Sequence, residues 1–487
     1  MANKFTRRRF LAALSAGAAW IALTSAPGCK PSQRAWTFRS RPDLCPPAVD
    51  VTMQAHDTAA GYIFITPGQG GAGQGGSMIL NDRGQVVWFR PLQGTHGLAM
   101  NLKVQTYRGR PVLTWGEIPS DYVIFDDAYR EIKRFRAGNG RDGDHHEFLI
   151  SPQDTALITI YNPVPWDLSS VGGLKDGVAW QGIVQELDIE TGEVLFEWRS
   201  LEHVGLDETY VTPSEDHYRG IDYFHINSVD VDHDDNLLVS ARETSAIYKI
   251  DRMSGEVIWR LGGKKSDFKM GPGTRFAYQH DARRQSDDTI SIFDNGTTVF
   301  HNGIPKAVEE SRGIVLELDE EEMTATLVRE YTHPDKLFAD AAGNMQVLPN
   351  GNVFIGWGRA RAFSEFSKDG ELLFDARLPS ENKSYRAFRF PWNADPSDQP
   401  AAIAEHASED EIRVYASWNG ATQIASWEVL ADQSPNQLET LGSVPRDGFE
   451  TAMSVRTAEP YVVVRAKHRS GRVLSTTESV QVSRSPS

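Results

Sequence analysis

The chain has 487 residues, of which 40% are hydrophobic and 10% aromatic, a composition typical of a soluble globular protein. Its formal net charge of −16 argues against a nucleic-acid partner, because phosphate backbones bind basic surfaces. A chain of this length can bury a large core, so folding requires neither a metal nor a disulfide. An anionic substrate would need a local cluster of cationic groups to attract it.

The first 29 residues are expected to form an export signal rather than part of the fold. The segment from Thr6 to Leu11 contains three consecutive arginines and is typical of a twin-arginine signal. The apolar stretch from Phe10 to Leu23 follows, and it is too short for a transmembrane helix. We therefore expect export to the periplasm or cell envelope; a basic start to a cytosolic protein is the alternative.

The chain contains only two cysteines, Cys29 and Cys45. Cys29 follows Gly28 at the end of the leader, as in a lipoprotein cleavage site, and is a candidate for lipidation and membrane anchoring, although Ala26 and Pro27 depart from the usual pattern. If Cys29 carries lipid, Cys45 has no partner and the mature protein lacks a disulfide. This is consistent with folding in the reducing cytoplasm before twin-arginine export.

One pattern recurs six times along the chain: an apolar strand, a turn rich in Asp and Gly, and a second strand that often ends in Trp or Phe. The clearest copy joins Ala246–Ile250 to Ser254–Trp259. The other copies begin at Met78, Tyr122, Val184, Ile314 and Phe363. Alternation of this kind bounded by turn residues predicts β-hairpins.

The copies start about 44 to 68 residues apart, which is close to the size of a four-stranded propeller blade with variable loops. The sequence therefore predicts an all-β fold with a six-bladed β-propeller over residues 43–433. Two β-sandwiches would also supply short strands but would not repeat a four-stranded unit six times. Residues 434–487 break the rhythm, and we expect a small C-terminal β appendage or strands that close the propeller.

Three histidines occupy matched positions in successive repeats. His146, His225 and His280 each precede an inner hairpin, with gaps of 10, 12 and 10 residues to its second strand. If the strand that follows each histidine is the innermost of its blade, the three imidazoles converge on one mouth of the central channel. Arg242 ends a strand in the same repeat as His225.

The remaining histidines do not share this phase. We expect solvent exposure for His145, His233 and His301, and a loop position at the same mouth for His333.

Three histidines and an arginine are compatible with two kinds of chemistry. A three-histidine zinc site is one, but the ligands must lie about 2 Å from the metal, and residues on separate blades are often too far apart. The other is nucleophilic attack by one neutral imidazole, while the remaining groups hold an anion. The planar guanidinium of arginine matches sulfate or phosphate. We expect no metal and no cofactor.

Several segments resemble the arylsulfotransferase family. They are Phe224–Asp230, Leu238–Arg242, Gly255–Gly263, Gln279–Arg283 with Ile292–Gly296, and His146–Phe148. The resemblance spans roughly residues 43–430, most of the chain after the leader. It implies a six-bladed propeller that moves a sulfuryl group from a phenolic sulfate ester to a phenol through a sulfated histidine, without 3′-phosphoadenosine 5′-phosphosulfate (PAPS).

Position by position, the resemblance assigns the nucleophile to His280 and the supporting groups to His146, His225 and Arg242. The characterised periplasmic members also carry a disulfide near the active site, and this sequence has no cysteine pair there.

Candidate contacts to the substrate are Asn227, Tyr161, Tyr223 and Trp357, with Trp166 as a further aromatic side chain. Aromatic rings suit a phenolic substrate, although the same residues also pack between blades. The expected partners are therefore a small phenolic sulfate donor and a phenolic acceptor. Two other functions stay open: a non-catalytic propeller that binds ligands or partners at the envelope, and an aryl sulfate hydrolase that uses water as acceptor.

Overall fold

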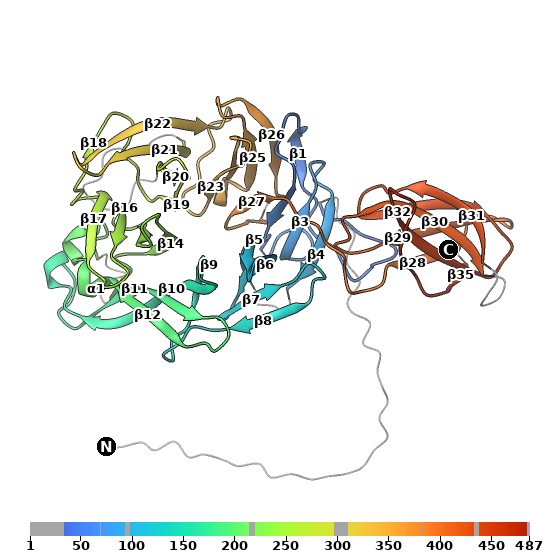
Figure 1. The fold of residues 1–487 in the computed structure, drawn as a ribbon, viewed down its shortest axis with the longest axis horizontal. Helices are drawn as coiled ribbons and strands as arrows, with labels where there is room; N and C mark the ends of the chain where they lie inside the picture. The colour runs from blue at the N-terminus through green and yellow to red at the C-terminus, as the bar shows by residue number, and fades with distance from the viewer. Residues whose placement is uncertain are drawn as a thin grey trace, which may run out of the picture.

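The computed structural model describes residues 34–68, 70–92, 98–213, 220–296, 310–379, 381–432 and 438–484. The structure is 51% strand and 3% helix. Six small sheets form a ring and a seventh sheet lies beside it (Figure 1). The predicted all-β, six-bladed propeller is confirmed. The expected signal, residues 1–29 with Cys29, lies outside the described residues.

Each blade is an antiparallel sheet of four main strands, with the first strand innermost (Figure 1). Blade 1 contains β27 (Ala387–Phe390), β2 (Tyr62–Ile65), β3 (Gly76–Leu80) and β4 (Val86–Pro91). Blade 2 contains β5 (Ala99–Tyr107), β6 (Arg110–Glu117), β7 (Asp121–Phe125) and β8 (Glu131–Phe135). Blade 3 contains β9 (Asp144–Ile150), β10 (Thr155–Trp166), β11 (Gly177–Asp188) and β12 (Val194–Arg199).

The other three blades continue in the same order. Blade 4 contains β14 (Ile226–Val231), β15 (Leu237–Ala241), β16 (Ala246–Ile250) and β17 (Val257–Gly262). Blade 5 contains β19 (His280–Arg284), β20 (Ile290–Asp294), β21 (Arg312–Asp319) and β22 (Thr324–Thr332). Blade 6 contains β23 (Asn344–Val347), β24 (Val353–Gly356), β25 (Ala362–Phe366) and β26 (Leu372–Arg377).

Three short strands extend these sheets: β1 (Asp50–Met53) on β26, β13 (Gly220–Ile221) on β11 and β18 (Lys269–Met270) on β22. The short helices are α1 (Ser200–His203), η1 (Ser169–Val171), η2 (Leu206–Glu208) and η3 (Gly358–Ala360). Within the described part of the chain, no helix is long and apolar enough to cross a membrane.

The six predicted repeats correspond to the third strands of the six blades, which are β3, β7, β11, β16, β21 and β25. In blade 4, every residue of β16 is buried. The turn that follows depends on Asp251, whose side chain accepts hydrogen bonds from the backbone N–H groups of Met253 and Ser254. Gly255 completes it with a φ of 79°, which favours glycine. Local turn chemistry therefore sets the repeat.

The ring closes in blade 1, where β27 from the end of the propeller pairs with β2 from its beginning. Phe64 lies opposite Phe388 in this pair. The propeller strands therefore span Asp50–Phe390, and residues after the expected boundary at 433 do not close the ring.

The seventh sheet is the C-terminal appendage, and it begins earlier than expected. Its strands are β28 (Ala401–His406), β29 (Glu411–Ser417), β30 (Ile424–Asp432), β31 (Leu438–Pro445), β32 (Glu450–Arg456), β33 (Tyr461–His468), β34 (Val473–Thr476) and β35 (Val480–Arg484). The expected boundary at 433/434 falls between β30 and β31, which pair with each other. The boundary was wrong because the buried residues Trp427 and Val429 of β30 pack inside this sheet and not in a blade.

The appendage lies against blade 1 (Figure 1). The Gly420 N–H donates to Val87 O at 2.8 Å, and the Asn419 side chain bonds both the N–H and the C=O of Phe89 at 2.9 Å. Phe38 packs on Phe449, with ring centroids 4.2 Å apart. Nearby, Cys45 is buried and disulfide-bonded. An unpaired Cys45 was expected only if Cys29 carries lipid, and Cys29 lies outside the described residues.

Candidate active site

The innermost strands of blades 2 to 5 are bulged near the end at which each strand begins. A bulge changes the direction in which side chains point and is common beside active sites. His146 lies in the bulge of β9, between the residues paired with Ile158 and Thr159. His225 precedes β14 with a φ of 53°, and His280 begins β19. The equal phase of the histidines therefore corresponds to equivalent positions at one mouth of the channel.

The structure brings the three histidines together around two tyrosines. The rings of His146 and His225 are 5.2 Å apart. Tyr385 lies 5.2 Å from the ring of His146 and 6.1 Å from that of His280. Tyr161 lies 5.4 Å from His146 and 5.1 Å from His225. These five side chains, contributed by blades 3, 4 and 5 and by the segment before β27, form the histidine cluster.

His280 is a buried, neutral imidazole with an assigned tautomer. The Asn295 amide donates both N–H groups to the backbone carbonyls of Ala339 and Ala342, so its Oδ1 faces the ring. His280 Nδ1–H therefore donates to Asn295 Oδ1 at 2.7 Å, and Nε2 keeps its lone pair. Burial, followed by the charge of Arg242, lowers the pKa of His280 well below its ordinary value.

The Ala342 N–H approaches His280 Nε2 at 3.3 Å. This contact marks the position of the lone pair and is long for a hydrogen bond.

His225 forms a carboxylate–imidazole pair with Asp222. Its Nδ1 bonds Asp222 Oδ2, while its Nε2 is buried without a hydrogen-bond partner among the described residues. Burial, Arg242 and His146 lower the pKa of His225 well below its ordinary value. Burial raises the pKa of Asp222 to about 6. The pair therefore holds a buried, unsatisfied ring nitrogen at Nε2 of His225, and its carboxyl group titrates near pH 6.

His146 repeats this arrangement with Asp144. Its Nδ1 bonds Asp144 Oδ1, which also accepts the His146 backbone N–H at 3.0 Å. Burial by itself would raise the pKa of Asp144, but the adjacent His146 lowers it on balance. An imidazole oriented by a carboxylate is positioned for proton transfer through its other nitrogen.

Arg242 is held beside the cluster. Its Nε donates to Glu243 Oε1 at 3.0 Å, and its guanidinium lies 5.0 Å from the centroid of the Tyr278 ring. Tyr278 in turn donates its hydroxyl to Glu243 Oε2 at 2.7 Å. The charge of Arg242 lowers the pKa of both His225 and His280, so the guanidinium acts electrostatically on both imidazoles.

The predicted substrate contacts fall into two groups. Tyr161 belongs to the histidine cluster, and its hydroxyl donates to Ile226 O at 2.5 Å. Asn227 is buried, donates to Gln279 O at 2.7 Å and leaves Oδ1 without a partner among the described residues. Tyr223 and Trp357 are instead fully buried blade residues.

The hydroxyl of Tyr223 donates to Ser200 Oγ at 2.7 Å, and the Trp357 indole donates to Ser364 Oγ at 2.9 Å. Both polar groups are thus satisfied inside the protein core, and the assignment of these two rings to the substrate stays a prediction.

The histidines that do not share the phase of the cluster differ in their surroundings. His145 is buried against Tyr122, with ring centroids 5.2 Å apart, so the expectation of exposure is wrong; the bulge turns it away from His146. His233 is half exposed, as expected, and bonds Asp288 at 2.7 Å. His333 is buried, bonds Asp375 at 3.2 Å and packs on Trp357. His301 lies outside the described residues.

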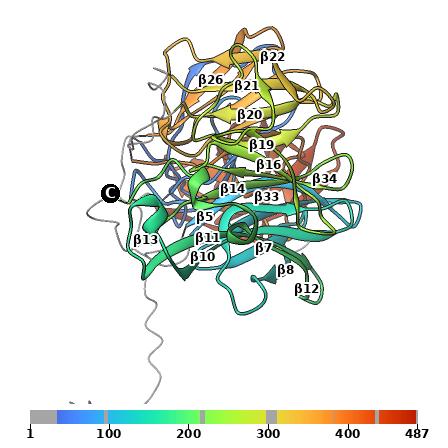
Figure 2. The same cartoon turned by 90° about the vertical axis from the view of Figure 1, so that its left-hand side faces the viewer.

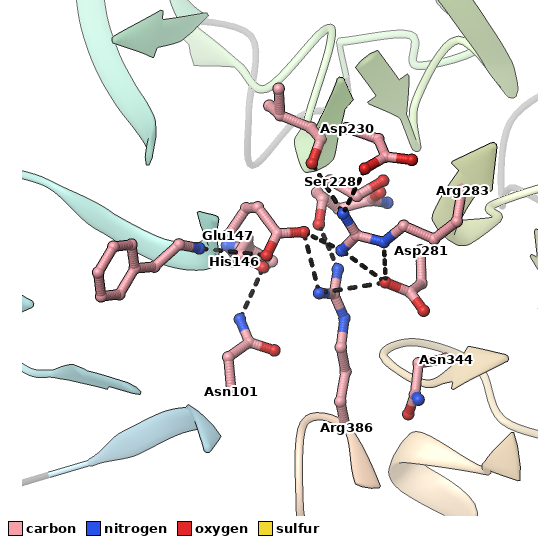
Figure 3. Close-up of polar contacts among 12 residues, drawn as sticks. Asn101, His146, Glu147, Ser228, Asp230, Asp281, Arg283, Asn344 and Arg386 are labelled. Atoms are coloured by element: carbon pink, nitrogen blue, oxygen red, sulfur yellow. Dashed lines mark hydrogen bonds and ion pairs between the residues drawn. The ribbon is translucent and has the colours of Figure 1, made fainter. Parts of the chain in front are cut away.

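A network of ion pairs lies next to the histidine cluster in the channel and was missed by sequence reasoning (Figure 3). Its centre is Glu147, a fully buried carboxylate that pairs with Lys103 at 2.8 Å, with Arg283, and with Arg386 at 3.1 Å. Asp281 pairs with Arg283 at 2.8 Å and with Arg386 at 3.3 Å. We call these five residues the channel network.

Burial would raise the pKa of Glu147, but Arg283, Lys103 and Arg386 together lower it far below its ordinary value. The network also reaches the cluster, because Arg386 donates to Asn227 O at 2.8 Å and Tyr385 precedes it in the chain. Glu147 follows His146 and Arg283 lies three residues after His280, so the same phase argument could have pointed to both. Apart from Asp281, which lies on the same strand as Arg283, their partners come from other segments of the ring and carried no local signal.

Among the described residues, no group of three or more His, Cys, Asp or Glu side chains is arranged to hold a metal ion. The zinc hypothesis therefore has no ligand cluster in this part of the chain. The arrangement found instead is one neutral imidazole, two carboxylate-bound imidazoles and an arginine around a common mouth.

Comparison with known proteins assigns the sequence to a family. No curated protein matches the chain. A protein of unknown function from Bacteroides caccae is 14% identical, with a TM-score of 0.42 over 68% of this chain and 99% of that one. A catalytically inactive virginiamycin B lyase from Staphylococcus aureus, in a structure with quinupristin, is 10% identical, with a TM-score of 0.36 over 76% of this chain and 97% of that one.

At these values the likenesses to solved structures carry no inference about function. The sequence profile described as Arylsulfotransferase (ASST) matches residues 103–378, which include all three histidines of the cluster and Arg242. The chain belongs to the arylsulfotransferase family.

Proposed function

We propose that the protein transfers a sulfuryl group from a phenolic sulfate ester to a phenol, independently of PAPS, and that His280 carries the group between the two half-reactions. Family membership supports an arylsulfotransferase-like function in general. The observation that carries the finer proposal is the state of His280: a buried, neutral imidazole whose proton is held on Nδ1 by Asn295. Such a ring presents a nucleophilic lone pair at Nε2.

In the first half-reaction, Nε2 of His280 attacks the sulfur of the donor and forms an N–S bond. The S–O bond to the aryl group breaks, and its electron pair leaves on the phenolate oxygen. His146, oriented by Asp144, delivers a proton to this oxygen. In the second half-reaction the acceptor phenol returns a proton to His146, its oxygen attacks sulfur, and the N–S bond breaks to restore neutral His280.

Arg242 and His225 would bind the non-bridging oxygens of the sulfuryl group. Arginine carries its charge permanently, and its planar donors match a tetrahedral oxyanion. The unsatisfied Nε2 of His225 takes up a proton when an anion binds, because an adjacent negative charge favours the imidazolium form. Asp222 stabilises that cation through Nδ1.

The test is intact-mass analysis after incubation with 4-nitrophenyl sulfate. Wild-type protein should gain one sulfuryl group, and adding phenol should discharge it. His280→Asn should gain none, whereas the control His233→Asn, which changes a half-exposed histidine outside the cluster, should be labelled like the wild type. A label that persists in His280→Asn would overturn the assignment of the nucleophile.

Two further outcomes separate the alternative functions. Release of free sulfate in place of transfer to phenol would indicate a hydrolase. Binding of the ester without a label or turnover would indicate a non-catalytic propeller.

We also propose export by the twin-arginine route to the periplasm or cell envelope, where the state of Cys29 decides whether the protein carries a lipid anchor. Cys45 is disulfide-bonded, and Cys29 is the only other cysteine in the chain. A thiol in a disulfide is not available for lipid attachment. Mass analysis of the mature N-terminus therefore distinguishes an acylated Cys29 from an oxidised pair, and an Arg8→Lys change combined with Arg9→Lys should block export.

A further inference from the structure

The hairpin of β10 and β11 in blade 3 is the longest among the described strands of the propeller. Beside the histidine cluster, it extends past the other two main strands of its blade. β10 and β11 have 12 residues each and pair without a shift from Thr155↔Asp188 to Trp166↔Gly177. The inner strand β9 pairs only as far as Thr159, and the outer strand β12 only as far as Ile183. The remainder of the hairpin therefore stands beyond the blade, with β13 along its edge at one face of the ring (Figure 2).

One face of this extension continues the wall of the site. Side chains alternate along a strand, and directly paired residues point to the same side of a sheet. Tyr161, which contacts His146 and His225, is therefore on the same face as Pro163 and its partner Trp180. Two residues along a strand span about 7 Å and neighbouring strands lie about 5 Å apart, so Trp180, on β11, is offset from Tyr161 by one side-chain repeat along the hairpin and one strand outward.

Trp180 is available to a ligand. Trp180 is 43% exposed, which is high for a tryptophan, a residue that is largely buried on average. Trp166 lies on the same hairpin with a similar exposure of 41%, but it pairs with Gly177 and so points to the opposite face. The hairpin thus carries two exposed tryptophans of which only one shares the face of Tyr161.

We propose that Trp180 forms the outer wall of an aryl-binding subsite and that this subsite selects donors with two fused rings over donors with one. The proposal rests on the proposed function, which places the sulfuryl group at His280 within the histidine cluster. The ring that carries the sulfate then lies against Tyr161 and Tyr385, and a second fused ring reaches Trp180. Flat aromatic faces stack favourably, so Trp180 determines specificity without taking part in the chemical steps.

The kinetic test compares 4-methylumbelliferyl sulfate, which has two fused rings, with 4-nitrophenyl sulfate, which has one. Trp180→Ala should raise KM for the two-ring donor about threefold to tenfold, the range expected for one stacking contact, and leave kcat within about twofold. KM for the single-ring donor should change little, Trp180→Phe should restore most of the difference, and Trp166→Ala should match the wild type with both donors. Equal effects of the two alanine variants, or of Trp180→Ala on both donors, would overturn the proposal.

A binding measurement in the His280→Asn background keeps this result separate from the proposed function. There, 4-methylumbelliferyl sulfate should bind about threefold to tenfold more weakly when Trp180→Ala is added, and unchanged when Trp166→Ala is added. If His280 is never sulfated but this difference persists, the aryl subsite stands and the transfer function fails. If His280 is sulfated and the difference is absent, the transfer function stands and the subsite fails.

Discussion

The histidine cluster and the channel network are neighbours in one channel, and they differ in how their charged groups are matched. In the network, Glu147 is fully buried and is paired with three cations, although Arg386 Nε has no hydrogen-bond partner among the described residues. In the cluster, His225 Nε2 and the adjacent Asn227 Oδ1 have no partner among the described residues, and burial raises the pKa of Asp222 to about 6. A buried polar group without a partner costs free energy unless a ligand satisfies it.

This difference indicates that the histidine cluster and the channel network have different roles. The ion pairs of the channel network join the inner strands of several blades. Under the proposed function, the unsatisfied groups at the cluster are those that a substrate would bind. Changes to the cluster should therefore reduce activity more than stability, and changes to the network should do the reverse.

The largest expected effect is the loss of transfer in His280→Asn. Removing the proposed nucleophile should lower kcat for 4-nitrophenyl sulfate by at least about a thousandfold, because the covalent intermediate on His280 can then no longer form. Circular dichroism and the melting temperature should stay close to those of the wild type. Activity above one hundredth of the wild-type value would contradict the proposed role.

The substitution Glu147→Gln in the channel network should lower the stability of the protein more than its activity. Removing one partner of a buried ion pair leaves uncompensated charge, and we expect a loss of about 3–5 kcal/mol in the free energy of unfolding at pH 7. Because the pKa of Glu147 is lowered in the folded state, its contribution is present above the ordinary pKa and is lost as pH falls toward the folded pKa. Urea unfolding at pH 7 and at about pH 3, well inside this interval, should thus show the variant approaching the wild type on acidification; a constant difference would contradict this.

Asp222→Asn should show the opposite dependence of stability on pH. The folded pKa of Asp222 is raised, so its ionised form costs stability increasingly as pH rises from about 4 to about 6. The stability of Asp222→Asn relative to the wild type should therefore increase over this interval. The same unfolding series compares both variants, and parallel curves for Asp222→Asn and Glu147→Gln would remove the distinction between the two regions.

Asp222 should also determine how kcat/KM decreases at acidic pH. Wild-type kcat/KM should fall as pH drops below about 6, because protonated Asp222 no longer orients and stabilises His225. His280 does not cause this fall, because its pKa lies well below its ordinary value and the ring is already neutral. Asp222→Asn should lower kcat/KM about tenfold to a hundredfold at pH 7 and remove the inflection near pH 6; an unchanged inflection would assign it to another group.

Some features of the site could be read from local patterns and others could not. The phase of His146, His225 and His280 was readable because a rotational repeat places equal positions at equal radius. The pairing of His225 with Asp222 lies within four residues and could have been noticed. Residues that depend on another blade, such as Arg386 against Glu147, have no signal in their own neighbourhood.

The sequence by itself determined the six-bladed architecture, because alternating apolar residues and Asp/Gly turns are local properties that each blade repeats. It also determined which histidines share a phase. The tertiary structure decided which aromatic side chains are buried, so Tyr223 and Trp357 pack in blades while Tyr161 reaches the histidines. It likewise decided that β30 joins the appendage and that a bulge separates His145 from His146. Burial, bulges and ion pairs between blades depend on segments far apart in the chain, and these come together only when the ring closes.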